Sequence, residues 1–256
     1  MSAPERDDEF FVGYFPTPKR TLRFSLGAGV IALLLVAGGA VAIAATMGNP
    51  GRGVIPFHGP ERRVGILQFA PHGILWTIDP RHPERVHAIH LVRGGKHGVP
   101  PQAAALDGRV VLVEGGLLDR NGQQMIELLR LPSASTDLAP DLEARIRARA
   151  PVALGHVRLR GEIVDSKCWL GRMRPGDGRT HRACAQLCVS GGIPPMLVTR
   201  APDGRETGYL VIGADRRAIH RELVEYLAEP VEIEGELERT GDLLVLRTEP
   251  DRVQRL

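Results

Sequence analysis

The stretch VEGGLLDRNGQQMIEL at residues 113–128 returns in altered form as IEGELERTGDLLVLR at residues 233–247, with a one-residue shift. A second pair of similar stretches lies upstream, HLVRGG at residues 90–95 and YLVIGA at residues 209–214. Similar stretches in the same order indicate an internal repeat. Each copy is expected to contain a strand that ends in a tight bend and then a hairpin, for which Asn-Gly at residues 121–122 is a strong signal.

Two charged positions recur in these stretches. Glu114 matches Glu234 before a glycine in each copy, and Arg120 matches Arg239 near the turns. We expect the two glutamates to pair with the two arginines as structural ions rather than to act in catalysis.

Short apolar or β-branched runs, separated by turn formers, surround both hairpins and are typical of strands. They lie at residues 64–69, 74–78, 88–92, 109–114 and 125–129 in the first copy, and at 157–164, 196–199, 208–212, 231–236 and 243–247 in the second. Five strands with a helix between the third and fourth follow the order of an OB-fold barrel. Ile219, Leu223 and Leu227 predict that helix at residues 216–227 of the second copy. The first copy lacks it, since Pro-Pro at residues 100–101 breaks the equivalent segment.

The predicted fold class is mainly β with one N-terminal transmembrane helix and two tandem OB-like five-stranded barrels, the second with a helix and a Cys/His insertion. Leu138, Leu142 and Ile146 lie at helical spacing and indicate a further helix between the barrels. The expected organisation is a cytoplasmic tail (1–23), a transmembrane helix (24–47), a linker (48–62), a first OB-like domain (63–135), a linker helix (136–150) and a second OB-like domain (151–256) with the insertion at 165–195.

Residues 24–47, FSLGAGVIALLLVAGGAVAIAATM, carry no charge and exceed the roughly 20 apolar residues that a membrane-spanning helix needs. We therefore expect this segment to cross the lipid bilayer once. A cleaved signal peptide is the alternative, because Ala-Ile-Ala at residues 42–44 has the form of a cleavage site. The apolar run is longer than a usual signal sequence and follows residues 1–23, which favours a retained anchor.

Basic residues set the expected orientation of this span. Lys19, Arg20 and Arg23 precede it, whereas only Arg52 closely follows it. The positive-inside rule then places the N-terminus in the cytoplasm and residues 48–256 outside. Arg far outnumbers Lys in the chain, which favours a bacterial source. The expected location is the inner membrane, with the bulk of the chain in the periplasm.

The tail before the span is unusually aromatic. Phe10, Phe11, Tyr14 and Phe15 lie within EFFVGYFPTP at residues 9–18. One interpretation is a disordered tail, and the other is a docking segment for a membrane-protein partner, because disordered tails are poor in aromatic residues.

Charge and aromatic content argue against nucleic acid as a partner. The formal net charge is +3, and aromatic residues make up 4% of the chain. Residues 52–256 contain only Phe57, Phe69, Trp76, Trp169, Tyr209 and Tyr226, some of which the barrel cores need. OB-folds bind nucleic acid through aromatic side chains on which bases stack, so we expect no nucleic-acid binding.

All three cysteines lie in the predicted insertion, which has no counterpart in the first copy. Cys168 follows the first strand of the second copy, after a Gly-x-x-x-Asp run. His181, Cys184 and Cys188 are spaced to lie on one face of a helix. This asymmetry between the copies makes the insertion the main candidate site.

Four interpretations of this cluster are open. A disulfide between Cys168 and Cys184 or Cys188 would staple the insertion to the barrel. A zinc site would use Cys168, His181, Cys184 and Cys188 as a Cys₃His ligand set. A redox or catalytic thiol would be Cys168, whose pKa the adjacent Lys167 could lower. A copper or haem-iron centre is the fourth, since the Cys-x-x-x-Cys spacing resembles copper loops, although their following histidine is absent.

Histidines are concentrated in the first copy. We expect them to be surface residues on a His/Arg-rich turn, with a metal site as the alternative. They are His72, His82, His87, His90 and His97.

The insertion carries a motif that resembles a set of largely uncharacterised bacterial exported or membrane-anchored OB-like proteins. GEIVDSKC at residues 161–168, HRAC at 181–184, Cys188 and GGIPP at 191–195 match their pattern of Gly-x-Val-x-Asp-x-x-Cys, His-x-x-Cys-Ala-x-x-Cys and a Gly-containing turn. The resemblance covers roughly residues 157–250 and implies a fold and a site rather than an activity. The N-terminal arrangement resembles a membrane-anchored branch that works beside a respiratory or other redox complex.

The leading functional prediction is non-enzymatic. We expect an accessory or assembly subunit of a larger membrane complex, which binds through the transmembrane helix, the aromatic tail and the OB-like domains. The alternative is a periplasmic metal-binding (zinc, copper or iron) or thiol-redox protein that uses the Cys/His cluster. A third hypothesis, an enzyme with Cys168 as nucleophile, has no further residue pattern behind it.

Overall fold

The computed structural model describes residues 17–47, 60–79 and 82–256. The chain divides into two compact units, Met1–Pro50 and Gly51–Leu256, which we describe separately. The aromatic residues Phe10, Phe11, Tyr14 and Phe15 lie outside the described residues.

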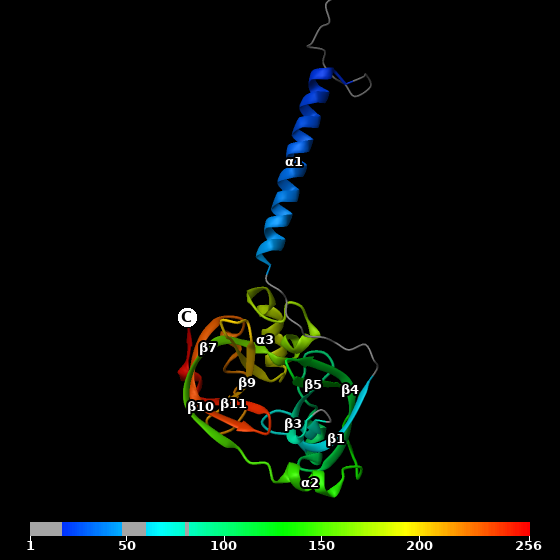
Figure 1. Cartoon of the computed structure of the whole chain (residues 1–256), viewed down its shortest axis with the longest axis vertical. Helices are drawn as coiled ribbons and strands as arrows, with labels where there is room; N and C mark the ends of the chain where they lie inside the picture. The colour runs from blue at the N-terminus through cyan, green and yellow to red at the C-terminus, as the bar shows by residue number, and fades with distance from the viewer. Residues whose placement is uncertain (1–16, 48–59, 80–81) are drawn as a thin grey trace, which may run out of the picture. The chain divides into compact units, whose positions relative to one another are not determined.

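The first unit contains one long helix, α1 (Lys19–Thr46), of 28 residues (Figure 1). It begins directly after Pro18, which suits the first turn of a helix because proline has no N–H to leave unpaired. Its apolar side chains are exposed on all sides, and none of its residues is buried. At about 1.5 Å per residue, α1 is long and apolar enough to span a membrane.

The first barrel has the strand order β1-β2-β3-β5-β4 and closes through pairing of β4 with β1. Only β3 and β5 are parallel, as an OB-fold requires. Its elements are β1 (Glu61–Gln68), β2 (Ile74–Asp79), β3 (His82–Arg93), β4 (Val110–Arg120), β5 (Gln123–Leu128) and the short β6 (Ser133–Ala134), which pairs with β4. The segment after Pro100 forms a short 3₁₀ helix, Pro101–Leu106, where an OB-fold has its helix.

The second barrel repeats this topology, with the order β11-β9-β8-β7-β10 and closure through β10 and β11. Its parallel pair is β9 and β11. The strands are β7 (Val152–Asp165), β8 (Pro195–Arg200), β9 (Glu206–Gly213), β10 (Pro230–Thr240), β11 (Leu243–Thr248) and β12 (Val253–Arg255), which pairs with β10. The prediction of two tandem OB-like barrels is confirmed.

The helix predicted at residues 216–227 is wrong. The segment forms turns and a single 3₁₀ turn, Val224–Tyr226, and Arg216 has a positive φ of 67°. Ile219, Leu223 and Leu227 are nevertheless fully buried in the core of the second barrel. Their spacing therefore reflects burial at the end of the barrel. An irregular backbone buries these side chains as well as a helix would.

Two further elements connect and extend the barrels. The helix predicted between them is present as α2 (Pro140–Arg147), and its Ile146 is buried against both barrels. The predicted helix in the insertion is present as α3 (Arg182–Ser190). Both helices therefore lie where the apolar spacing placed them.

The hairpins of the two copies have the same register. Gly116 pairs with Glu127 in the first barrel, and Glu236 pairs with Arg247 in the second. The closing pairs are Arg120 with Gln123, and Thr240 with Leu243. Arg120 is thus equivalent to Thr240 and not to Arg239, and no shift of one residue is needed between the hairpins.

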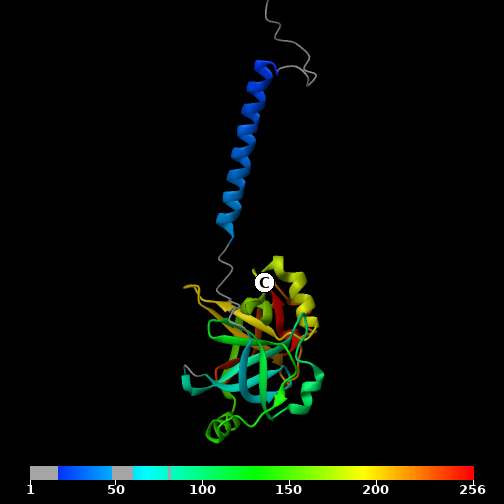
Figure 2. The same cartoon turned by 90° about the vertical axis from the view of Figure 1, so that its right-hand side faces the viewer.

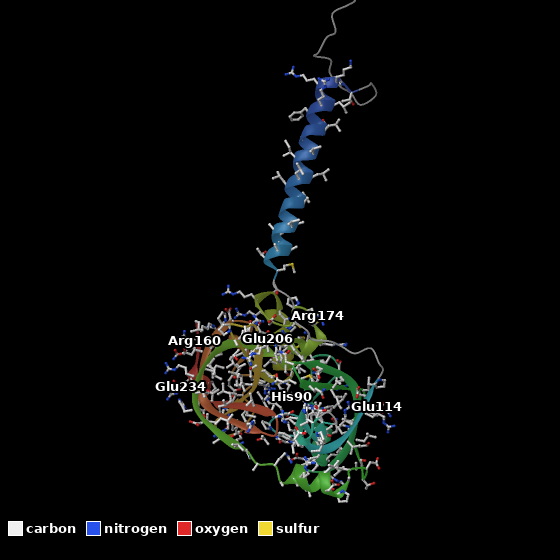
Figure 3. All side chains as sticks on the ribbon, viewed as in Figure 1. His90, Glu114, Arg160, Arg174, Glu206 and Glu234 are labelled. Carbon is white, nitrogen blue, oxygen red and sulfur yellow. The ribbon has the colours of Figure 1, made fainter. Side chains whose placement is uncertain are left out.

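The predicted ion pairs have different partners. Glu114 lies directly across from Arg62 and also contacts Arg130 at 3.1 Å. Glu234 lies directly across from Arg158, at 2.9 Å. Because side chains directly opposite each other on neighbouring strands are closest, these cross-strand arginines replace the predicted Arg120 and Arg239. Glu114 and Glu234 lie on the outer faces of the first and second barrels (Figure 3).

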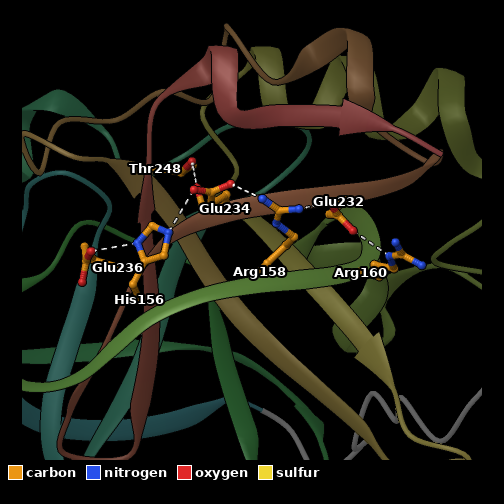
Figure 4. Close-up of polar contacts among 7 residues, drawn as sticks. All are labelled: His156, Arg158, Arg160, Glu232, Glu234, Glu236 and Thr248. Atoms are coloured by element: carbon orange, nitrogen blue, oxygen red, sulfur yellow. Dashed lines mark hydrogen bonds and ion pairs between the residues drawn. The ribbon is translucent and has the colours of Figure 1, made fainter.

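A ladder of charges covers the outer face of β7 and β10 (Figure 4). His156 contacts Glu236 at 2.9 Å and Glu234 at 3.0 Å. Arg160 contacts Glu232 at 2.6 Å on the same face. Positive and negative groups alternate along the two strands and pair with each other. These charges therefore hold β7 and β10 together.

The two barrels lie against each other (Figure 1, Figure 2). They share apolar clusters at their contact, which we call the seam. Ala88 of β3 packs with Leu210 and Ile212 of β9, and Val92 packs with Trp169. These side chains point out of their own barrels, yet they are buried. The second unit is therefore a single body, in which two apolar clusters contain side chains of both barrels.

Candidate thiol and metal centre

The insertion lies between β7 and β8, and a buried aspartate organises its first turn. Asp165, at the end of β7, is completely buried. Its Oδ1 accepts a hydrogen bond of 2.8 Å from the backbone N–H of Cys168. Its Oδ2 lies 2.8 Å from Nε2 of His181, at the start of α3. One carboxylate thus fixes both the turn with Cys168 and the imidazole of His181.

The three cysteine sulfurs converge. The Sγ atoms of Cys168, Cys184 and Cys188 all lie within 4.8 Å of one another, and all three thiols are free. Cys184 and Cys188 lie one turn apart on α3, so their side chains share a face. Cys168 and Cys188 are buried, whereas Cys184 is half-buried. The cluster can therefore be reached through Cys184.

The predicted ligand set is brought together as two overlapping groups. The three sulfurs form one group, and Asp165, Cys168 and His181 form the other, again with ligand atoms within 4.8 Å. Cys168 belongs to both. His181 therefore does not join the three sulfurs as a fourth member, and its Nε2 is engaged by the aspartate. The disulfide interpretation has no support, because no two cysteines are bonded.

A lysine of the first barrel completes the cluster. The Nζ atom of Lys96 lies 2.9 Å from Sγ of Cys184 and 3.6 Å from Sγ of Cys188. Its loop is tied to the insertion by a hydrogen bond of 3.0 Å from the backbone N–H of Gly98 to the carbonyl of Gly191. Sequence reasoning missed Lys96, because nothing local links it to cysteines in the other barrel.

Lys167, by contrast, does not face the sulfurs. Its Nζ atom donates to the carbonyls of Arg93 at 3.0 Å and Gly95 at 2.7 Å, and it lies 3.2 Å from Glu127. This buried lysine therefore joins the insertion to the first barrel. The pKa of the neighbouring Cys168 is raised, contrary to the sequence-based interpretation.

The pKa values of the two buried thiols, Cys168 and Cys188, are shifted in opposite directions. The hydrogen bond to Cys188 is the main cause that raises the pKa of Cys168, and burial and Asp165 act in the same direction. The same hydrogen bond lowers the pKa of Cys188 to about 7, and the charge of Lys96 contributes. Cys188 is thus the more acidic thiol, and Cys168 acts as its hydrogen-bond donor. A nucleophilic role for Cys168 loses its basis, since the thiolate is the nucleophilic form.

Sequence comparisons find no protein-family model that matches this chain and no curated protein that matches it. The resemblance of the insertion to bacterial exported proteins therefore stays a prediction.

The histidines of the first copy are not all surface residues. His72, His87 and His90 are buried, whereas His82 and His97 are exposed. The expectation of a histidine-rich surface turn is wrong for the buried three. His90 on the outer face of β3 and His72 in the loop before β2 are covered at the seam. His87 instead lies on the face of β3 that carries Ile89, and it is enclosed by Gln124 and Asp242.

His87 is part of a polar chain at this seam. Its Nδ1 contacts Asp242 of the second barrel, and its Nε2 lies 3.0 Å from Oε1 of Gln124. Although burial opposes it, the hydrogen bond to Asp242 raises the pKa of His87. The contact with Asp242 therefore stabilises the charged imidazole and links the two barrels.

Proposed function

We propose that this protein is a membrane-anchored carrier of a thiophilic metal ion, bound by Cys168, Cys184 and Cys188. The observation that carries the proposal is the convergence of three free sulfurs from two separate elements within 4.8 Å. Thiolates favour zinc, Cu(I) and iron–sulfur centres. A soft metal ion of this class is the group that fits the donor set.

The donor set needs little adjustment to hold such an ion. Sulfurs that share one zinc ion at about 2.3 Å lie roughly 3.8 Å apart, and the three Sγ atoms here all lie within 4.8 Å of one another. The ammonium of Lys96 offsets part of the negative charge that three thiolates would carry. Asp165 holds His181 as carboxylates hold imidazoles around metal sites, next to Cys168.

The anchor and the compartment rest on the N-terminal segment. α1 supports membrane attachment through its length and its exposed apolar surface. The basic residues before α1 support a cytoplasmic N-terminus and a metal site outside the inner membrane.

Metal analysis of the full chain in mild detergent with a reductant tests the proposal. We expect Cys168→Ser, Cys184→Ser and Cys188→Ser each to bind one ion fewer per chain than the unchanged protein, after loading with zinc or Cu(I). Met173→Leu is the matched control, since it replaces an exposed sulfur side chain outside the cluster. Equal metal content in the cysteine variants and the control would refute the proposal.

Thiol redox chemistry is a second candidate, favoured by the lowered pKa of Cys188 beside two further thiols. In that case two thiols would form a disulfide, and their two electrons and two protons would reduce a disulfide of a partner protein. Thiol counting separates the candidates. Three reactive thiols after removal of the metal favour the metal site, and one reactive thiol in protein without metal favours redox chemistry.

The accessory or assembly subunit stays a prediction. It is compatible with a metal carrier, since α1 exposes apolar side chains that a partner in the membrane could contact. Purification in mild detergent tests it, and a strictly monomeric protein without a partner would remove it.

A further inference from the structure

Three histidines line one cavity at the seam, outside the thiol cluster. The cavity has a volume of about 340 Å³. His72 reaches it from the loop between β1 and β2, His97 from the loop after β3, and His220 from the loop after β9. The short segment between Lys96 and Gly98 separates this cavity from the sulfurs, because Lys96 faces the cysteines while His97 and Gly98 line the cavity.

Two of these rings are spaced as ligands of one ion. The ring centroids of His72 and His220 are 5.7 Å apart, and the ring planes meet at 65°. Two imidazoles that bind one metal ion at about 2.0–2.1 Å have ring centroids about 5–6 Å apart. The separation of the two rings is therefore compatible with one shared ion.

Both rings also present a nitrogen that lacks a partner. Nε2 of His72 and Nδ1 of His220 are buried, and neither has a hydrogen-bond partner within the described part of the chain. His72 is 5% exposed, so bulk water does not solvate it. Buried polar atoms are rarely left unpaired, since each costs about 1–3 kcal/mol. A group that bonds both nitrogens is expected next to the two rings.

The protonation state of the rings suits a metal ion. Burial is the main cause that lowers the pKa of His72 to about 3, and burial also lowers the pKa of His220. Both imidazoles are therefore neutral at neutral pH, and each keeps a nitrogen lone pair that can bind a metal ion.

We propose that His72 and His220 bind a borderline divalent transition metal ion, of the class of Zn²⁺, Ni²⁺ or Cu²⁺, in this cavity. Imidazole ligands suit these ions. Water would occupy the remaining positions. The site does not depend on the thiol cluster, since no cysteine lines the cavity.

Equilibrium dialysis of the full chain against Zn²⁺ in mild detergent tests the proposal. We expect His72→Gln and His220→Gln each to bind one zinc ion fewer per chain than the unchanged protein. His82→Gln, which changes an exposed histidine outside the cavity, should bind as many ions as the unchanged protein. Circular dichroism and thermal unfolding identify a variant that fails to fold, and His220→Gln is the safer of the two because His220 is less buried than His72.

The Cys168→Ser/Cys184→Ser/Cys188→Ser variant separates this site from the proposed function. Zinc that remains in this variant and disappears on adding His220→Gln supports the histidine site. If zinc is lost with the cysteines and is unchanged in His220→Gln, the thiol site stands and the histidine site is overturned. If zinc is lost only with His220→Gln, the histidine site stands and the thiol function falls. X-ray absorption of the protein loaded with Ni²⁺ shows which atoms bind the ion. Two imidazole ligands would confirm the histidine site, and oxygen ligands alone would overturn it.

Discussion

Cys188 owes its acidity to its neighbours. The hydrogen bond from Cys168 is the largest contribution to its lowered pKa of about 7, and the Lys96 ammonium adds to it. We expect Lys96→Met to raise the pKa of Cys188 in the metal-free protein, so that less thiolate is present at pH 7. The ultraviolet absorbance of the thiolate against pH measures the change.

Lys96→Arg is the matched control, because it keeps the positive charge near the sulfurs. It should titrate close to the unchanged protein. A thiolate titration that is the same in Lys96→Met and the unchanged protein would show that Lys96 does not act on Cys188.

His90 is a buried base that makes the fold sensitive to acid. It is 2% exposed, and its Nδ1 has no partner among the residues that the structure describes. Burial lowers its pKa from 6.5 to about 4. Between these two pH values the unfolded chain binds a proton that the folded chain does not, so stability falls as the pH drops through this window. The shift corresponds to roughly 3 kcal/mol once the pH is below about 4.

His90→Leu should therefore flatten the loss of stability between pH 6.5 and about 4. The free energy of unfolding, measured by denaturant at several pH values, gives the comparison. His87 titrates in the opposite sense, since its raised pKa stabilises the folded chain at low pH and this contribution fades as the pH rises through that pKa. Only the difference between the variant and the unchanged protein isolates His90, and parallel pH curves for the two would contradict the prediction.

At the scale of elements, the end of α3 determines where Lys96 lies. Gly191 follows α3, and a Cβ atom there would lie 1.8 Å from the backbone carbonyl oxygen of Lys96. We expect Gly191→Ala to push this loop away and to lower the free energy of unfolding by about 1–3 kcal/mol. Denaturant unfolding measures the loss.

Gly116→Ala serves as the control for this substitution, since a Cβ atom there meets nothing within 4 Å. Its effect should stay within about 0.5 kcal/mol. Equal stabilities of the two alanine variants would mean that the loop accommodates the extra methyl group.

In the loop between β9 and β10, the spacing of apolar residues predicts a helix that the structure does not contain. Ile219, Leu223 and Leu227 fit a helical stripe, yet they fill the end of a barrel from turns. On α3 and α2 the same kind of spacing does mark helices. The spacing of apolar residues indicates which side chains are buried. Whether the backbone there is helical or irregular depends on where the next strand must begin.

At the scale of the whole molecule, Arg120 links the two barrels. From β4 it donates at 2.8 Å to the carbonyl of Trp169, lies 4.8 Å from that ring and contacts Glu206 at 2.7 Å. It is 4% exposed. We expect Arg120→Met to lower the free energy of unfolding by roughly 1–3 kcal/mol, because the buried carbonyl of Trp169 loses its hydrogen-bond donor and Glu206 keeps only Arg200.

Arg239→Met is the matched control, since Arg239 lies on the equivalent hairpin but is exposed. Its effect should be within about 0.5 kcal/mol. Denaturant unfolding of both variants measures the two free energies of unfolding. An equal decrease in both variants would show that Arg120 does not link the barrels.

The sequence by itself determined α1, the strand order of both barrels, and the helical placement of Cys184 and Cys188. Each of these depends on a run of apolar residues, a turn or a spacing of a few residues, which are local signals. The tertiary structure alone decided that Lys96 meets the thiols, that Arg120 rather than Arg239 is buried, and that histidines lie at the seam. These contacts join residues from different barrels, and whether a polar side chain is covered depends on the surface that packs against it.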